Sequence, residues 1–251
     1  MTTAVQKIAI IGATSAIAEH CARLWLAQGA NELLLVGRNA DRLERVRADL
    51  TVRQPACKIG LVIASLTELS GIKALVDTCC EGATPDIVLV AHGSLPDQTT
   101  CQRSLDETRQ ALEVNALSPA LIAEAFAARL EAAGHGKLIL IGSVAGDRGR
   151  KINYVYGAAK GLVERYAQGL QHRLAGTNVT VTLVKPGPTD TPMTAHLKGQ
   201  GAKLAPVQDV AARIVDGAAK GKTVVYAPAK WELIMLIIRH LPRFIFNKLN
   251  I

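Results

Sequence analysis

Residues 7–18 read KIAIIGATSAIA, an apolar run that passes through one glycine and several small residues into a helical pattern. A turn of this kind lets backbone N–H groups at the start of the helix meet a pyrophosphate. Thr14 or Ser15 can cap that helix or donate a hydroxyl to a phosphate oxygen. Ala16 and Ala18 stand where closely spaced glycines would be expected. The turn alone is therefore equally compatible with an ordinary strand–helix connection.

Outward from this turn, short apolar runs alternate with stretches of helical periodicity. The expected strands are Lys7–Ile11, Glu32–Val36, Lys58–Ile63, Ile87–Ala91, Lys137–Ile141, Thr180–Lys185 and Thr223–Tyr226. The expected helices lie at about Ala16–Gln28, Ala40–Thr51, Glu68–Glu81, Ser104–Ala133, Tyr154–Ala175 and Val207–Lys220. Continuously apolar strands are typical of a parallel sheet covered on both faces. We predict an α/β fold with a single Rossmann-type, doubly wound parallel sheet of about seven strands and helices on both faces. One domain is expected over residues 1–251, ending in a tail at 231–251.

The composition narrows the class of protein. The 251 residues are 49% hydrophobic and 20% charged, which excludes a disordered chain. Five cysteines, with no CxxC and no histidine at metal-ligand spacing, indicate reduced thiols in a cytoplasmic protein without a metal site. The net charge of +8 comes from scattered Lys and Arg with few aromatics between them, so nucleic acid is not an expected partner. We expect no signal peptide and no apolar run near the roughly 18 residues of a membrane span.

The end of the second expected strand bears on the choice of nucleotide. A site that prefers NAD usually places a carboxylate there, which bonds the adenosine ribose hydroxyls. Residues 36–39 are Val-Gly-Arg-Asn, without a carboxylate. The guanidinium of Arg38 offers charge-assisted bonds to a 2′-phosphate. We therefore expect NADP(H), with NAD(H) as the alternative.

Four polar residues indicate chemistry at the other end of the chain. Tyr156 and Lys160 are four apart and share one helical face. Ser143 follows an expected strand at its carboxyl end, where ligands bind in open α/β sheets. It precedes Tyr156 by few enough residues for the loop to bring the two hydroxyls together. Asn115 sits in an apolar helix, where a buried amide costs free energy unless it is hydrogen-bonded.

Together these motifs resemble the short-chain dehydrogenase/reductase family, from the Gly12 turn through Asn115, Ser143, Tyr156 and Lys160 to KPGPTDT at 185–191. The resemblance implies that Tyr156 is the general acid/base and that Lys160 lowers its pKa and binds the nicotinamide ribose. It implies that Ser143 polarises the carbonyl and that Asn115 holds a water in a proton relay. The cofactor contacts predicted from the strand ends and the resemblance are Gly12, Thr14, Ser15, Ala16, Ile17, Arg38, Asn39, Ser65, Leu66, Ala91, His92, Gly93, Tyr156, Lys160, Pro186, Gly187, Thr189 and Thr191.

The sequence also departs from the family pattern. The usual Asn-Asn-Ala-Gly is here Val90-Ala91-His92-Gly93, and Ser65-Leu66 stands where the family often has Asp-Leu or Asp-Val for adenine. These changes affect cofactor affinity and nucleotide preference more than the chemistry. His92 is interpreted as a structural histidine bonded to backbone, with a catalytic base as the alternative. A tyrosine has an ordinary pKa near 10, and the lysine and the nicotinamide charge are expected to lower it toward neutrality.

The tail at 231–251 is mostly apolar, carries Arg239, Arg243 and Lys248, and is interrupted by Pro242. It favours either peripheral contact with the inner face of a membrane or a subunit interface in a homodimer or homotetramer. The Gly12 turn, His92 and this tail together are similar to bacterial reductases of polyprenyl-phosphate-linked keto-sugars. We therefore expect an NADP(H)-dependent oxidoreductase that interconverts a bulky or apolar ketone, such as a lipid-linked keto-sugar, and its secondary alcohol. The alternatives are a reductase of fatty-acyl, steroid or xenobiotic ketones and a non-catalytic dinucleotide-binding redox sensor.

Overall fold

The computed structural model describes residues 6–199 and 203–249. Seven parallel strands form one sheet in the order β3-β2-β1-β4-β5-β6-β7. The strands are β1 Lys7–Ile11, β2 Glu32–Gly37, β3 Lys58–Ile63, β4 Ile87–Val90, β5 Gly136–Ile141, β6 Val179–Pro186 and β7 Val224–Ala227. Strand order reverses between β1 and β4, so a crevice forms at the carboxyl ends of these two strands. The predicted fold class is confirmed.

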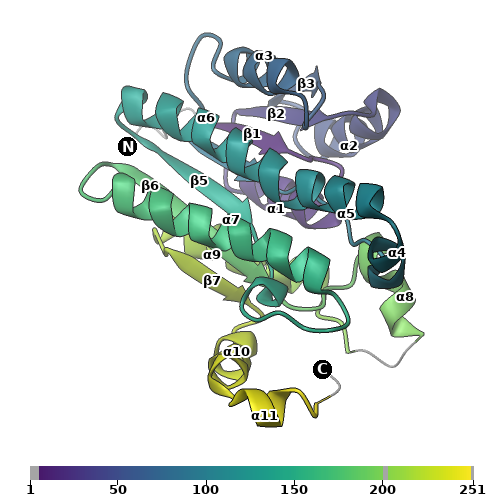
Figure 1. Cartoon of the computed structure of the whole chain (residues 1–251). Coiled ribbons are helices and arrows are strands. Elements are labelled where there is room, and N and C mark those ends of the chain that lie inside the picture. The colour runs from purple at the N-terminus through teal and green to yellow at the C-terminus, as the bar shows by residue number, and fades with distance from the viewer. Residues whose placement is uncertain (1–5, 200–202, 250–251) are drawn as a thin grey trace.

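The helices cover both faces of the sheet (Figure 1). They are α1 Ala16–Ala27, α2 Ala40–Arg53, α3 Leu69–Cys79, α4 Gln98–Arg103, α5 Leu105–Leu112, α6 Ser118–Ala133, α7 Tyr154–Arg173, α8 Ala195–Lys198, α9 Val207–Ala219, α10 Lys230–His240 and α11 Arg243–Phe246. Residues of α1, α2 and α9 form one buried apolar cluster, and those of α3, α6 and α7 form the other. Alternate residues of β1 serve the two clusters: Ile8 and Ile10 pack on one side, and Ala9 and Ile11 on the other.

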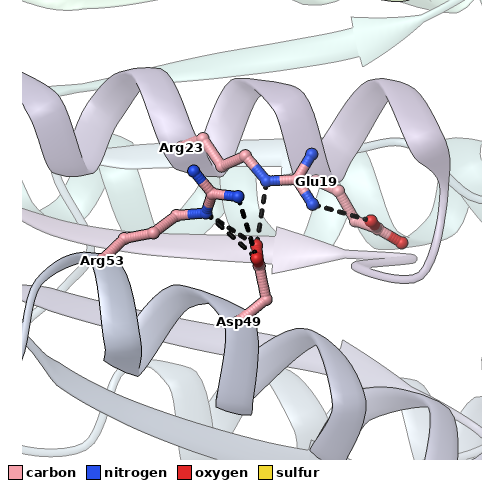
Figure 2. A network of polar contacts seen from close by, with 4 residues as sticks. All are labelled: Glu19, Arg23, Asp49 and Arg53. Carbon is pink, nitrogen blue, oxygen red and sulfur yellow. Dashed lines mark hydrogen bonds and ion pairs between the residues drawn. The ribbon is translucent and has the colours of Figure 1, made fainter.

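A network of charged side chains fastens α1 to α2 on the surface (Figure 2). The Asp49 carboxylate of α2 accepts from Arg23 Nε of α1 at 2.9 Å and from Arg53 Nη2 at 3.0 Å. Arg23 also pairs with Glu19 at 3.5 Å. Hydrogen bonds from Arg53 and Arg23 lower the pKa of Asp49 to about 2. The network therefore stays charged at neutral pH and holds the first two helices side by side.

The expected helix Ser104–Ala133 is interrupted. A π-helical turn, η1 Glu113–Leu117, separates α5 from α6. By length and hydropathy, Leu105–Ala133 qualifies as a membrane span, so the expectation that no run comes near this length is wrong. However, 56% of its most apolar window is buried in this fold, where Phe126 and Leu130 belong to the core. The apolarity of this run serves the packing of α6 on the sheet.

The C-terminal helices α10 and α11 lie beyond β7 at one end of the molecule (Figure 1). Pro242 separates them, as expected from the sequence. Met235 of α10 is buried with Val144 and Tyr226. Arg148 fixes the end of α10, because its guanidinium donates to the Leu241 carbonyl at 2.7 Å and lies 3.7 Å from the centre of the Phe246 ring.

Candidate active site

A cavity opens where the carboxyl ends of β4, β5 and β6 meet α7 and α10. It encloses about 930 Å³ of empty space, the open solvent at its mouth included. Thirteen of the predicted site residues line it: Ser15, Ile17, Ala91, His92, Gly93, Asn115, Ser143, Tyr156, Lys160, Pro186, Gly187, Thr189 and Thr191. The structure thus brings both predicted groups of residues, catalytic and cofactor-binding, around one space.

Tyr156 and Lys160 project from the first turns of α7. Lys160 Nζ donates to the Ile141 carbonyl at 2.9 Å and lies 5.7 Å from the centre of the Tyr156 ring. Ser143 Oγ accepts from the backbone N–H of Ala145 at 3.1 Å, which leaves its O–H free to donate. The loop after Ser143 presses on α7, since a Cβ at Gly157 would lie 2.9 Å from the Ala145 carbonyl oxygen. Packing therefore fixes the serine relative to the tyrosine.

Burial sets the protonation of both α7 groups. It raises the pKa of Tyr156 to about 12, with hydrogen bonding by Ser143 acting in the opposite direction. It lowers the pKa of Lys160 to about 8. In the protein alone, loss of water around the phenolate dominates. The expected shift of the tyrosine pKa toward neutrality depends on the nicotinamide charge as well and stays a prediction. At neutral pH the phenol keeps its proton and the lysine is mostly charged.

Asn115 lies in the π-helical turn η1 and is fully buried. Its Nδ2 donates to the Ala111 carbonyl at 3.0 Å and to Ser94 Oγ at 3.2 Å. Its Oδ1 accepts from the Ser94 backbone N–H at 2.8 Å. The expected hydrogen bonding of this buried amide is confirmed, and it ties the turn to the loop after β4. A π-helical turn inside a helix is frequent at functional sites.

His92 is held by a side chain, and the expected bond to backbone is wrong. Its Nε2 lies 2.7 Å from Ser118 Oγ, and Ser118 donates its own proton to the Leu66 carbonyl. His92 Nε2 is therefore the donor. Burial lowers the pKa of His92 to about 3, aided by the charges of Lys160 and Arg38. Its Nδ1 is a buried acceptor with no partner among the residues that the structure describes.

Seven predicted cofactor contacts lie outside the cavity lining: Gly12, Thr14, Ala16, Arg38, Asn39, Ser65 and Leu66. Gly12 has φ +81°, and a Cβ there would lie 2.5 Å from the backbone nitrogen of His92, so only glycine fits this turn. Ser15 is the N-cap of α1 but makes no side-chain cap, contrary to one of its two expected roles.

Two of the remaining polar side chains at the nucleotide end have local partners. Asn39 Oδ1 accepts from the Arg42 N–H at 2.8 Å and caps α2. Ser65 Oγ accepts from the Glu68 N–H at 3.3 Å. Arg38 is exposed at the end of β2. Of these side chains, Arg38 has the greatest freedom to meet a ligand.

Several lining residues were missed by sequence reasoning. Trp231 of α10 packs on the Pro186–Gly187 segment, because a Cβ at Gly187 would lie 1.9 Å from the indole nitrogen. Arg150 and Asn153 come from the loop before α7. Met193 lies in the 3₁₀ turn Pro192–Thr194. No spacing pattern signals Trp231, whereas the place of Arg150 and Asn153 between Ser143 and Tyr156 could have suggested them.

A buried ionic cluster lies close in sequence to residues that line the cavity. Lys185 of β6 pairs with Asp147 and, at 2.7 Å, with Glu164 of α7. The Tyr226 hydroxyl donates to Asp147 at 2.9 Å. Asp147 follows Ser143 by four residues and Lys185 precedes Pro186, so the cluster joins the serine loop to the proline–glycine segment.

Comparisons with known proteins agree with this geometry. Residues 6–201 match the family model for short chain dehydrogenases. An uncharacterized oxidoreductase of Streptomyces coelicolor is 31% identical over 247 residues, covering 97% of this chain and 96% of the relative. A short-chain dehydrogenase from Sphingobium yanoikuyae, solved with NADPH, has a TM-score of 0.82 at 22% identity, covering 95% of this chain and 97% of the other. A short chain dehydrogenase from Burkholderia cenocepacia, solved with NADP, has a TM-score of 0.82 at 18% identity, with 98% of each chain covered.

Proposed function

Because the chain belongs to the short-chain dehydrogenase/reductase family and is an oxidoreductase, we propose that it interconverts a ketone and a secondary alcohol by hydride transfer with NADP(H). The observation that carries this proposal is the convergence of Ser143, Tyr156 and Lys160 on one cavity. The tyrosine there is protonated at neutral pH, as a proton donor must be, since burial raises its pKa to about 12.

The residues divide the work of ketone reduction between them. The nicotinamide, when bound, supplies the hydride to the carbonyl carbon. Ser143 donates its O–H to the carbonyl oxygen as negative charge develops there. Tyr156 transfers its proton to the same oxygen and completes the alcohol. Lys160 has two N–H donors left after its bond to the Ile141 carbonyl, and we assign them to the cofactor ribose and the developing phenolate. Asn115 is proposed to hold the water that returns a proton.

The residues present fit a dinucleotide. Gly12 allows the first turn to approach its neighbours closely, and Ser15 and Gly187 both line the cavity. His92 Nδ1 offers a buried acceptor with no partner in the described chain. Arg38 supports a preference for NADP(H), because no carboxylate stands at the end of β2. The dehydrogenases from Sphingobium yanoikuyae and Burkholderia cenocepacia, whose titles name NADPH and NADP, support the same cofactor class.

The substrate side of the proposal rests on the tail and the cavity wall. We propose a bulky or apolar ketone, because Ile17, Leu95 and Trp231 leave much of the wall apolar. We also propose that α10 and α11 contact the anionic inner face of a membrane. The exposed apolar side chains of these two helices and of the residues after them are Leu233, Leu236, Ile237, Phe244, Ile245 and Leu249. Arg239, Arg243 and Lys248 lie among them, and their positive charges complement the negative charge of such a surface. A lipid-linked keto-sugar would fit both the apolar cavity wall and the membrane contact. We propose that the protein is cytoplasmic and acts as a single domain.

The proposed activity is tested with purified protein and a broad panel of ketones. NADPH oxidation is followed at 340 nm, with NADH in parallel, and the melting temperature is measured with each nucleotide. Reduction of at least one ketone with NADPH preferred supports the proposal. A melting temperature raised by NADPH without reduction of any ketone supports a dinucleotide-binding sensor instead.

A further inference from the structure

Among the described residues that line the cavity, one cation is not used by the proposed chemistry. Arg150 lies on the loop between Ser143 and Tyr156 and lines the cavity. Its Nε is buried and has no hydrogen-bond partner among the described residues. Burial lowers the pKa of its guanidinium, and no acidic side chain contributes to that shift. Because a buried donor without a partner costs free energy, the position calls for a ligand.

Arg148, two residues earlier, shows how an arginine of this loop is used for structure. Its guanidinium donates to the carbonyls of Leu241 and Ile238 and lies over the Phe246 ring. Arg148 is thereby committed to holding α10 in place. Arg150 has no comparable partner in the described part of the chain, although it belongs to the same loop.

Asn153 adds a second unpaired group at the same place. It lines the cavity three residues after Arg150, and its Oδ1 is buried without a partner among residues 6–199 and 203–249. It is the N-cap of α7, yet its side chain makes no capping bond. A helix N-cap asparagine usually accepts from the helix. Here a donor and an acceptor both remain unused beside the proposed proton donor.

The charge of the lining shows what Arg150 would bind. Within the described chain, the cavity lining includes no Asp or Glu. Its second cation, Lys160, already has a hydrogen bond to backbone and a proposed role at the ribose. An arginine favours carboxylate and phosphate oxygens, which it binds through two parallel hydrogen bonds. The apolar wall suits the rest of an amphiphilic molecule.

We propose that Arg150 and Asn153 form a subsite for an anionic group of the substrate, a carboxylate or a phosphoester. Arg150 binds the anionic oxygens, and Asn153 Oδ1 accepts from a neighbouring hydroxyl or N–H of the same molecule. The substrate is then an anionic ketone with an apolar body. That the substrate is a ketone rests on the proposed function. The binding of anions at Arg150, however, can be tested without turnover.

The first experiment measures binding by calorimetry, with and without saturating NADP⁺. The probes are octanoate, octyl phosphate and octan-1-ol, which share one chain length and differ in charge. We expect wild-type protein to bind one of the two anions about 10- to 150-fold more tightly than the alcohol, as for a charge-assisted pair. The better anion identifies the preferred head group. Arg150→Gln should reduce that ratio to within about 2-fold, and Arg150→Lys should retain part of it.

Lys151→Gln is the matched control, because Lys151 is exposed and adjacent and its loss changes the net charge equally. It should keep the wild-type ratio. Melting temperatures of all variants establish folding, and Arg150→Lys keeps the test valid where Arg150→Gln unfolds. Equal binding of the anions and the alcohol by wild-type protein overturns the subsite. Loss of the preference in Lys151→Gln as well overturns it too, because the effect is then one of net charge.

A kinetic arm separates this inference from the proposed function. With NADPH, Arg150→Gln should lower kcat/KM for 2-oxo-4-phenylbutanoate at least 10-fold relative to its ethyl ester. An equal loss on acid and ester overturns the subsite while the reductase remains. Arg150-dependent anion binding without reduction of any ketone has the opposite meaning: the subsite stands and the proposed function fails.

Discussion

Two parts of the site are built in different ways. The catalytic wall contains Asn115, Ser143, Tyr156 and Lys160, and the nucleotide edge contains Arg38 and Asn39. In the catalytic wall, the side chains of Ser143, Asn115 and Lys160 each make a hydrogen bond with backbone, and those of Asn115 and Lys160 are also buried. At the nucleotide edge, Asn39 serves as a helix cap while Arg38 is exposed. The wall therefore has its hydrogen bonds in place in the protein alone, whereas the edge is proposed to select its ligand through the exposed charge of Arg38. Substitutions in the wall should change rates, and substitutions at the edge should change preferences.

The largest expected effect comes from the wall. Tyr156→Phe removes the proton donor but keeps the ring, so we expect turnover to fall at least ~100-fold. NADPH affinity, measured by fluorescence titration, should stay near the wild-type value. Lys160→Ala should lower both turnover and NADPH affinity, because the proposed role of this lysine includes binding the cofactor ribose. Near-normal turnover of Tyr156→Phe would exclude Tyr156 from the mechanism and remove the contrast between wall and edge.

At the edge, Arg38→Asp should shift preference from NADPH toward NADH. A charge-assisted bidentate pair contributes about 1.5–3 kcal/mol, so NADPH affinity should fall roughly 10- to 150-fold while kcat with saturating cofactor changes little. Lys73→Asp is the matched control, since Lys73 is exposed on α3 and undergoes the same charge change. Equal affinity of wild-type protein for NADH and NADPH would contradict the assignment of Arg38.

The pH profile sharpens the contrast within the wall. Burial lowers the pKa of Lys160 to about 8, so the ammonium is lost as pH rises through that value rather than near 10.5. We expect kcat/KM for NADPH to fall up to about 10-fold per pH unit above pH 8. His92, with a pKa lowered to about 3, should add no inflection near 6.5. An inflection there that disappears in His92→Asn would show that His92 titrates in the mechanism.

Local patterns in the sequence predicted most of the fold. Continuous apolar runs placed the seven strands to within a residue or two, since a doubly covered parallel strand is apolar throughout. The π-helical turn was missed, because its residues keep the apolar pattern of the flanking helices. The capping role of Asn39 carried a sequence signal, an asparagine directly before a helix, that was interpreted only as cofactor binding.

The site was less predictable where contacts span the chain. His92 was expected to bond to backbone, yet its partner Ser118 lies 26 residues away. Trp231 reaches Gly187 across 44 residues of sequence, because β7 pairs beside β6 and delivers α10 to the cavity. No rule of sequence spacing predicts either contact. The effect of burial on the pKa of Tyr156 was also missed, since burial is a property of the packed fold and not of neighbours in sequence.

The last expected effect concerns the tail, which joins the cavity wall at Trp231 and exposes apolar side chains along α10 and beyond it. Each basic residue near an anionic surface contributes about 1 kcal/mol. The triple variant with Arg239, Arg243 and Lys248 changed to Gln should therefore bind anionic vesicles more weakly than wild-type protein. Binding should also weaken with salt. The control changes Lys73, Arg109 and Lys222 to Gln, and it should bind vesicles as wild-type protein does.

Truncation after Leu241 decides between a membrane and a second subunit as the surface that covers the tail. It removes Phe244, Ile245 and Leu249 but keeps Trp231 at the cavity and Met235 in its buried place. If the tail meets lipid, sedimentation with anionic vesicles should fall while the oligomeric state is unchanged. Dissociation of an oligomer with no vesicle effect would instead assign the tail to a subunit interface. Wild-type protein that ignores anionic vesicles at low salt would end the membrane proposal, because apolar exposure and positive charge are the two features on which it depends.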